Sequence, residues 1–161
     1  MAVGYKVYHD VPGKKFNIDH VVVGKNGVFA IETKGRSKKN SNEGKENARV
    51  IYDGEVLNFP TWKESDPINQ VKNVSVWLSK ELSSAVGEEV KVESALSISG
   101  WYIDRKSNAS PCVYNGKSPE RIFPKLRCQE LSEQLIARIT HQIERMVNDV
   151  KPKAYKPKEN T

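Results

Sequence analysis

The chain has 161 residues and a mass of 18.2 kDa, which is the size of one compact domain. No run approaches the ~18 consecutive apolar residues that a membrane-spanning helix needs, which excludes a membrane protein of that kind. The two cysteines, Cys112 and Cys128, are too few for a disulfide scaffold, and the first residues lack the apolar segment of a secretory signal. We therefore expect reduced thiols in a cytoplasmic protein.

Basic residues exceed acidic ones by 26 to 20, and the net charge of +6 is spread unevenly. Residues 1–50 carry ten basic and five acidic side chains (+5), residues 51–100 carry four and eight (−4), and residues 101–161 carry twelve and seven (+5). Residues 151–161 are rich in lysine and nearly free of apolar side chains, which is typical of disorder. We expect one domain over residues 1–150, followed by a basic, disordered tail.

Hydrophobic periodicity and turn residues predict short strands first and two long helices later. We expect strands over residues 5–10, 18–23, 28–34, 48–52, 55–59, 90–99 and 113–114, a bend or continuation at 101–103, a short helix from 118, and long helices over 67–83 and 130–149. Asp66 suits the N-cap of the first long helix, Pro67 its first position and Gly87 its end. This order predicts a mixed α/β architecture.

One pair of strands carries charges where a buried strand would carry apolar side chains. Asp19 lies in the first strand of a predicted hairpin, and Glu32 and Lys34 close the second. If Asn26-Gly27 forms the turn, Glu32 faces Val21 and Lys34 faces Asp19. Because side chains alternate along a strand, the two carboxylates and the lysine should share one face.

The chemistry of this cluster follows from its charges. The carboxylates of Asp19 and Glu32 repel each other unless a cation lies between them, and a hard divalent ion such as Mg²⁺ takes such oxygen ligands. The Thr33 carbonyl is a further candidate ligand. A bound ion would lower the pKa of a water and neutralise a scissile phosphate, and Lys34 would orient that water or stabilise developing charge. The residues alone leave two interpretations open: phosphodiester hydrolysis, or a cross-strand ion-pair cluster at the end of a sheet.

Other common signatures of catalysis are absent from the sequence. The three histidines lack metal-binding spacing, and there is no GxSxG, GxGxxG or phosphate-binding GxxxxGKS/T. The acid-x-Lys pattern also begins at Glu43, Glu89, Asp104 and Asp149. Only Glu32 ends a strand of buried character that pairs with a strand bearing an aspartate.

The hairpin sequence closely resembles a known family signature. The segment NIDHVVVGKNGVFAIETKG, residues 17–35, resembles the signature of the NERD (nuclease-related domain) family of the PD-(D/E)XK restriction-endonuclease-like superfamily. The resemblance continues through DPINQVKNVSVWLSKEL, residues 66–82, and VESALSISGWYI, residues 92–103. It spans roughly residues 4–103.

The resemblance implies a restriction-endonuclease-like α/β fold, with a central mixed sheet flanked by helices, and a metal-dependent DNA nuclease. It implies that Asp19 and Glu32 bind Mg²⁺ or Mn²⁺, that Lys34 is the catalytic lysine and that Gln70 is a helix glutamine supporting the site. Family members usually carry an acidic helix before the first strand, and we expect this chain to lack it. A DNA-binding or DNA-processing accessory module that retains the fold without cleaving is therefore the alternative. The oligomeric state is left open.

Basic residues flank the hairpin on both sides. Lys14 and Lys15 precede Asp19, and Arg36, Lys38 and Lys39 follow the second strand. A positive track beside a nuclease site suits the phosphate backbone of DNA. We predict that these five side chains bind DNA, with a solvated loop as the alternative interpretation.

Overall fold

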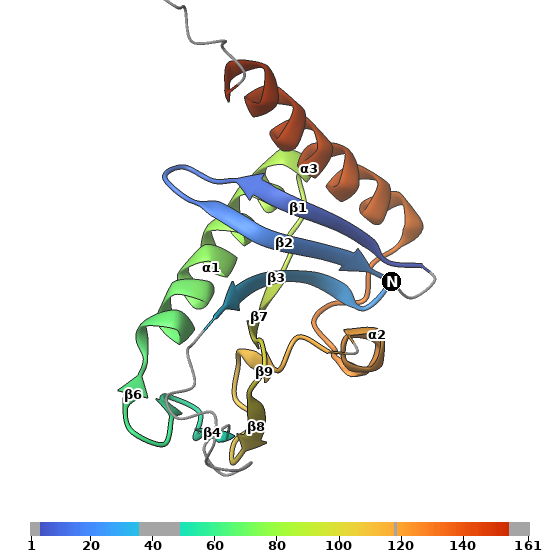
Figure 1. Ribbon diagram of the computed structural model, residues 1–161. Coiled ribbons are helices and arrows are strands. Elements are labelled where there is room, and N and C mark those ends of the chain that lie inside the picture. The colour runs from blue at the N-terminus through green and yellow to red at the C-terminus, as the bar shows by residue number, and fades with distance from the viewer. Residues whose placement is uncertain (1–3, 36–48, 118, 155–161) are drawn as a thin grey trace, which may run out of the picture.

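Five strands form the main sheet, and the first three follow one another as antiparallel neighbours (Figure 1). The computed structural model describes residues 4–35, 49–117 and 119–154. The sheet has the order β1-β2-β3-β7-β9, with bounds β1 Lys6–Pro12, β2 Asn17–Gly24, β3 Gly27–Lys34, β7 Val92–Ile98 and β9 Cys112–Tyr114. The sheet is mixed, because β7 runs parallel to both β3 and β9. The strand order places β3 and β7 in the interior of the sheet.

A second sheet of four strands lies below the first in Figure 1. Its order is β6-β5-β4-β8, with bounds β4 Arg49–Tyr52, β5 Leu57–Asn58, β6 Lys63–Glu64 and β8 Tyr102–Arg105. The predicted β4–β5 hairpin is confirmed, with Tyr52 opposite Leu57. The chain bends away after β7, because Gly100 adopts a φ of 82°, a left-handed conformation that glycine tolerates, and β8 joins the second sheet.

The first long helix, α1 Asp66–Val86, buries one stripe of its surface. The apolar members of this stripe are Ile68, Val71, Val74, Leu78, Leu82 and Val86. Gly87 ends the helix with a φ of 78°, as predicted. The predicted N-cap at Asp66 is wrong, because the carbonyl of Ser65 already accepts a helical hydrogen bond from the amide of Asn69.

The second long helix, α3 Glu133–Ala154, begins later than the predicted residue 130. Leu131 is still bonded to the β2–β3 turn, its amide lying 2.9 Å from the carbonyl of Lys25. The hydroxyl of Ser132 then accepts the amide of Leu135 at 3.1 Å at the start of the helix. The helix includes residues 151–154, which the sequence analysis assigned to the tail, and residues 155–161 lie outside the described part of the chain.

A short helical segment precedes α3 and confirms the helix predicted near residue 118. It consists of α2 Pro119–Ile122 and the 3₁₀ turn η2 Phe123–Lys125. Phe123 is fully buried against the rings of Phe29 and Tyr114, with centroids 5.3 and 5.8 Å away. This packing fixes the segment against the main sheet.

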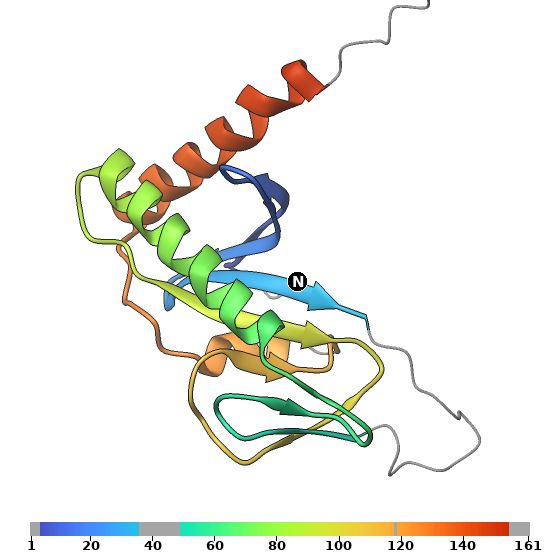
Figure 2. The same ribbon diagram turned by 90° about the vertical axis from the view of Figure 1, so that its left-hand side faces the viewer.

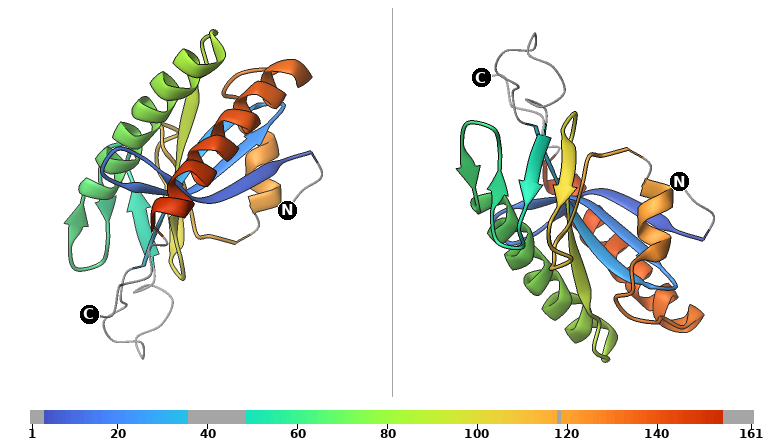
Figure 3. Two further views of the ribbon diagram at one scale, coloured as in Figure 1. Left: turned by 90° about the horizontal axis from the view of Figure 1, so that it is seen from above. Right: turned by 90° about the horizontal axis from the view of Figure 1, so that it is seen from below.

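The helices divide between the two faces of the main sheet (Figures 2 and 3). The side covered by α1 and α3, called here the helical face, buries Val21, Val23, Val28 and Ala30 of the sheet together with Leu78, Leu82, Leu135 and Ile139 of the helices. The side covered by α2 and η2, called here the opposite face, buries Val22, Phe29, Ile31, Ala95, Tyr114 and Phe123. This architecture confirms the expected α/β fold and is consistent with the restriction-endonuclease-like arrangement.

None of the helices in the described residues combines the length and the apolar character that crossing a bilayer requires. Both cysteines are free thiols, as expected.

Candidate functional site

The β2–β3 hairpin has a different register from the one predicted. Gly24 pairs with Gly27, so that Lys25 and Asn26 alone form the turn, and Val21 pairs with Ala30. Gly27 is already the first residue of β3, with a φ of 139° that favours glycine. The prediction that Glu32 faces Val21 is therefore wrong.

The correction brings the two carboxyl groups closer together. Continuing the ladder beyond the His20–Ile31 pair places Asp19 opposite Glu32, rather than opposite Lys34 as predicted. The shift is an even number of residues, so the side chains keep the predicted face. That face is the helical one, because Val21 and Ala30, at even spacing from Asp19 and Glu32, are buried beneath α1 and α3.

Asp19 and Glu32 form a close pair at the end of the sheet. The backbone amide of Thr33 donates a 2.8 Å hydrogen bond to Oδ2 of Asp19, which fixes this carboxyl group between the strands. Glu32 is only 5% exposed. Burial, followed by the charge of Asp19 and a side-chain hydrogen bond with it, raises the pKa of Glu32 from its ordinary 4.5 to about 7.

Lys34 lies near this pair without forming an ion pair with it. Its charge lowers the pKa of Glu32, a smaller effect than burial and Asp19 have in raising it. The ion pairs within the described residues are Arg49–Asp104, Lys106–Asp104 and Arg138–Glu88. The two carboxyl groups thus contact each other, and Lys34 lies nearby without pairing with either. This arrangement does not match the interpretation as an ion-pair cluster.

The oxygen ligands offered by the carboxyl pair are of the type that a hard divalent cation prefers. Asp19 and Glu32 offer carboxylate oxygens, and a cation between them would relieve the repulsion that helps to raise the pKa of Glu32. Within the described residues, no group of three or more His, Cys, Asp or Glu side chains is assembled for a metal. Further ligands would be main-chain oxygens, such as that predicted at Thr33, and water, which Mg²⁺ retains readily.

Gln70 projects from the first turns of α1 and is exposed. It shares a helix face with Trp77, seven residues on, and the Trp77 ring packs edge-on against Phe16 at 5.2 Å. Phe16 directly precedes β2, so this face of α1 looks toward the strand that carries Asp19. No hydrogen bond joins Gln70 to either carboxyl group in the part of the chain described, and its supporting role stays a prediction.

Two of the predicted DNA-binding lysines lie at the same end of the sheet as the carboxyl pair. Lys14 and Lys15 are exposed in the β1–β2 turn, and β2 begins beside the end of β3 because the two strands are antiparallel. Arg36, Lys38 and Lys39 lie outside the described residues.

His20 belongs to the opposite face and not to this site. Its Nδ1 lies 2.7 Å from Nδ1 of His9 on the neighbouring strand. Burial, then the charge of His9, lowers its pKa. The contact with His9 gives His20 a hydrogen-bonded structural role between the strands.

Sequence reasoning missed the contribution of the backbone to the site. The Thr33 amide holds Asp19, although the sequence suggested only the Thr33 carbonyl as a functional group. The signal that could have corrected the register is the pair of glycines, Gly24 and Gly27, which bracket a two-residue turn.

Comparison with known families assigns the chain to a family. The chain matches the family model NERD, described as nuclease-related domain, over residues 2–99. The matched segment contains β1, β2, β3, α1 and β7, and with them Asp19, Glu32 and Lys34. Searches of curated proteins and of solved structures each found no significant match. Since the matched segment covers more than half of the chain, the protein belongs to the NERD (nuclease-related domain) family.

Proposed function

We propose that this protein is a metal-dependent nuclease that hydrolyses phosphodiester bonds in DNA. The observation that carries the proposal is the direct contact between Asp19 and Glu32, with Lys34 two residues along the same strand face. Two carboxyl groups held together at a nearly buried position repel each other when both are ionised, and a bound cation would relieve that repulsion. Membership of a nuclease-related family supports the same conclusion.

The residues that would hold Mg²⁺ or Mn²⁺ are Asp19 and Glu32, with the Thr33 carbonyl. When bound, the ion neutralises the scissile phosphate and acidifies a coordinated water. The Thr33 amide donates a hydrogen bond to Oδ2 of Asp19, one of the two carboxylate oxygens. This bond keeps the Asp19 carboxylate oriented. Burial of Glu32 excludes water from one side of the pair and strengthens its electrostatic interactions.

Lys34 would assist the attacking water and stabilise the charge that develops on the phosphate. Its ammonium group is available for this because it is not held in an ion pair with either carboxyl group. Gln70 would support the site from α1. Lys14, Lys15, Arg36, Lys38 and Lys39 would bind the DNA backbone on either side of it.

The test is a plasmid-nicking and single-strand cleavage assay with Mg²⁺, using the wild type, Glu32→Gln and Lys34→Ala. Each variant should lose activity by about 10² to 10⁴-fold, the usual contribution of a general acid–base or charge-stabilising group. The matched controls are Glu89→Gln and Lys91→Ala, which alter another acid-x-Lys sequence at exposed positions. Equal activity in all five proteins would refute the assignment.

One observation favours the alternative, a DNA-binding module that keeps the fold without cleaving. The described residues bring no third acidic or histidine side chain to Asp19 and Glu32. Calorimetric titration with Mn²⁺ and a DNA duplex separates the two functions. Duplex binding without cleavage under saturating Mn²⁺ would establish the alternative.

A further inference from the structure

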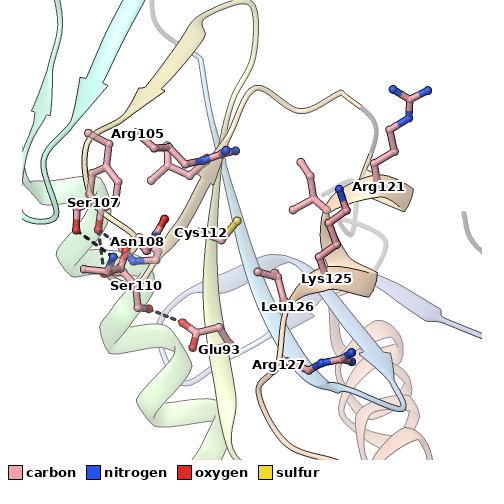
Figure 4. A pocket seen from close by; sticks show the side chains of 15 residues that line it. Glu93, Arg105, Ser107, Asn108, Ser110, Cys112, Arg121, Lys125, Leu126 and Arg127 are labelled. Atoms are coloured by element: carbon pink, nitrogen blue, oxygen red, sulfur yellow. Dashed lines mark hydrogen bonds between the residues drawn. The ribbon is translucent and has the colours of Figure 1, made fainter.

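A basic pocket lies on the opposite face of the main sheet, away from the carboxyl pair. Its walls are the β8–β9 connection, residues 107–111, and the α2–η2 segment, and its volume is about 510 Å³ (Figure 4). Glu93 of β7 lies at its edge, at even spacing from Ala95, which is buried on the opposite face. The volume is in the range of small-ligand sites.

Positive charge dominates this pocket. Four of its lining side chains are cationic, Arg105, Arg121, Lys125 and Arg127, and one is acidic, Glu93. In Figure 4 the Arg105 side chain extends from one wall toward the wall that carries Lys125. None of the ion pairs in the described residues involves any of the four cations.

Arg105 is held in position by the main chain. Its Nε donates a 2.7 Å hydrogen bond to the carbonyl of Val113, while its charge acts to lower the pKa of the neighbouring Cys112 thiol. The guanidinium group is thus fixed near the floor of the pocket. A planar guanidinium held by one edge can present its remaining N–H groups to the oxygens of a phosphate.

Glu93, the single acid, is already occupied. It accepts hydrogen bonds from the hydroxyl of Ser110 and, at 3.0 Å, from the amide of Ser94. A single acid counters the charge of four cations only in part, so an anionic ligand is favoured.

The floor of the pocket is apolar. It is lined by Pro111, Ile122 and Leu126, and by Cys112, whose thiol has its pKa raised by burial. An inorganic anion alone would leave this surface uncovered. A ligand with a flat apolar part and an anionic part would fill both regions.

Both walls are held by buried or part-buried hydrogen bonds to side chains, so the pocket is preformed. The Tyr52 hydroxyl lies 2.9 Å from the carbonyl of Ser110 and 3.0 Å from that of Ala109. On the other side, the Asn26 side chain donates to the carbonyls of Phe123 at 2.6 Å and Leu126 at 2.7 Å. Little ordering entropy remains to be lost on binding.

We propose that this pocket binds a nucleoside 5′-phosphate, with the phosphate on Arg105 and Lys125 and the base over the apolar floor. The group could be a free nucleotide or the phosphorylated end of a nucleic acid strand, which share this chemistry. The site is separate from the carboxyl pair, and neither proposal depends on the other.

The test is calorimetric titration of the full chain in EDTA, which removes divalent ions and so excludes binding through the carboxyl pair. The probes are thymidine, thymidine 5′-monophosphate, inorganic phosphate, and hexathymidylate with and without a 5′-phosphate. Thymidine 5′-monophosphate should bind more tightly than either thymidine or phosphate. Tighter binding of phosphorylated hexathymidylate than of its unphosphorylated form would identify a strand end as the source, and binding of the mononucleotide alone would identify a free nucleotide.

Two variants locate the binding. Arg105→Gln and Lys125→Gln should each weaken it by about tenfold or more, as expected for loss of a charge-assisted hydrogen bond. The control is Lys80→Gln, at an exposed position of α1 on the other side of the sheet. Amide resonances of residues 107–113 and 121–127 should shift on titration. No saturable binding by the wild type, or equal affinity in all the variants, would overturn the proposal, and Lys125→Gln decides if Arg105→Gln does not fold.

Discussion

The two faces of the main sheet carry opposite chemistry. The helical face ends in the Asp19–Glu32 carboxyl pair, whereas the opposite face bears a pocket with four cations and one acid. The carboxyl pair is local in the sequence, because two adjacent strands of one hairpin supply it. Both residues also lie inside the segment that matches the family. The pocket is assembled mostly from residues 105–127, which lie beyond the match at residues 2–99. The two faces thus differ in origin, since the carboxyl pair comes from one hairpin inside the matched segment and the pocket mostly from residues beyond it.

The largest expected effect comes from removing the ring that fixes α2 and η2 to the sheet. Phe123→Ala should lower the free energy of unfolding by about 3–5 kcal/mol, because it empties a fully buried site beside Phe29 and Tyr114. Chemical denaturation measures the loss. At a temperature where the variant is folded, nucleotide binding should be lost and Mn²⁺ binding retained.

Phe123→Leu is the milder companion variant, since it keeps most of the apolar volume. Loss of Mn²⁺ binding along with nucleotide binding in the leucine variant would contradict the independence of the two faces.

The second effect concerns the carboxyl pair in the absence of metal. Because the pKa of Glu32 is raised to about 7, the folded protein binds this proton more tightly than the unfolded chain. The resulting stability is present below the ordinary pKa of 4.5 and is lost as pH rises through about 7. The shift corresponds to about 3 kcal/mol across that range.

Denaturation in EDTA at a series of pH values measures this dependence. Glu32→Gln should flatten it, and the exposed control Glu89→Gln should leave it unchanged. Saturating Mn²⁺ should also flatten the wild-type curve if the pair binds the ion. Identical pH profiles for the wild type and Glu32→Gln would show that burial and Asp19 do not raise the pKa of Glu32.

A smaller effect is expected at the β2–β3 turn, where the Asn26 side chain bonds to the segment around η2. Asn26→Ala removes the side-chain donor to the carbonyls of Phe123 and Leu126, of which Phe123 keeps the amide of Leu126, and the loss should cost about 1–3 kcal/mol. The variant should also weaken nucleotide binding, because the same bonds hold one wall of the pocket. Tyr5→Phe is the matched control, since it removes only the bond from the Tyr5 hydroxyl to the Asn26 side chain. A larger loss of stability in Tyr5→Phe than in Asn26→Ala would contradict the prediction that the bonds from Asn26 to the two carbonyls matter more than the bond from Tyr5.

The sequence was sufficient for the parts of the molecule that depend on local pattern. Alternating and helical periodicities predicted most of the strands, both long helices and the shared face of Asp19 and Glu32, because neighbours along the chain decide those features. The register of the hairpin was missed because it depends on which residues form the turn. Asn26 was taken as a turn residue only, although its side chain also bonds to residues about a hundred positions away.

The basic pocket could not be predicted from sequence patterns. Arg105, Lys125 and Glu93 are far apart along the chain, and only the packing of α2 and η2 on the sheet brings them together. Each of these charges taken singly resembles an ordinary exposed residue. Their significance comes from the pinned walls around them, which depend on tertiary hydrogen bonds.

The smallest effect is a change in the reactivity of the thiol on the pocket floor. Burial and Glu93 raise the pKa of Cys112, whereas Arg105 lowers it, so the thiolate should form at higher pH than in a free cysteine. In a Cys128→Ser background, the iodoacetamide reaction of Arg105→Gln should shift to higher pH, and that of Glu93→Gln to lower pH. The pH midpoint of the rate, rather than the rate itself, separates these charge effects from changes in access. A midpoint that moved the same way in both variants would mean that Arg105 does not direct its charge into the pocket where the phosphate is proposed to bind.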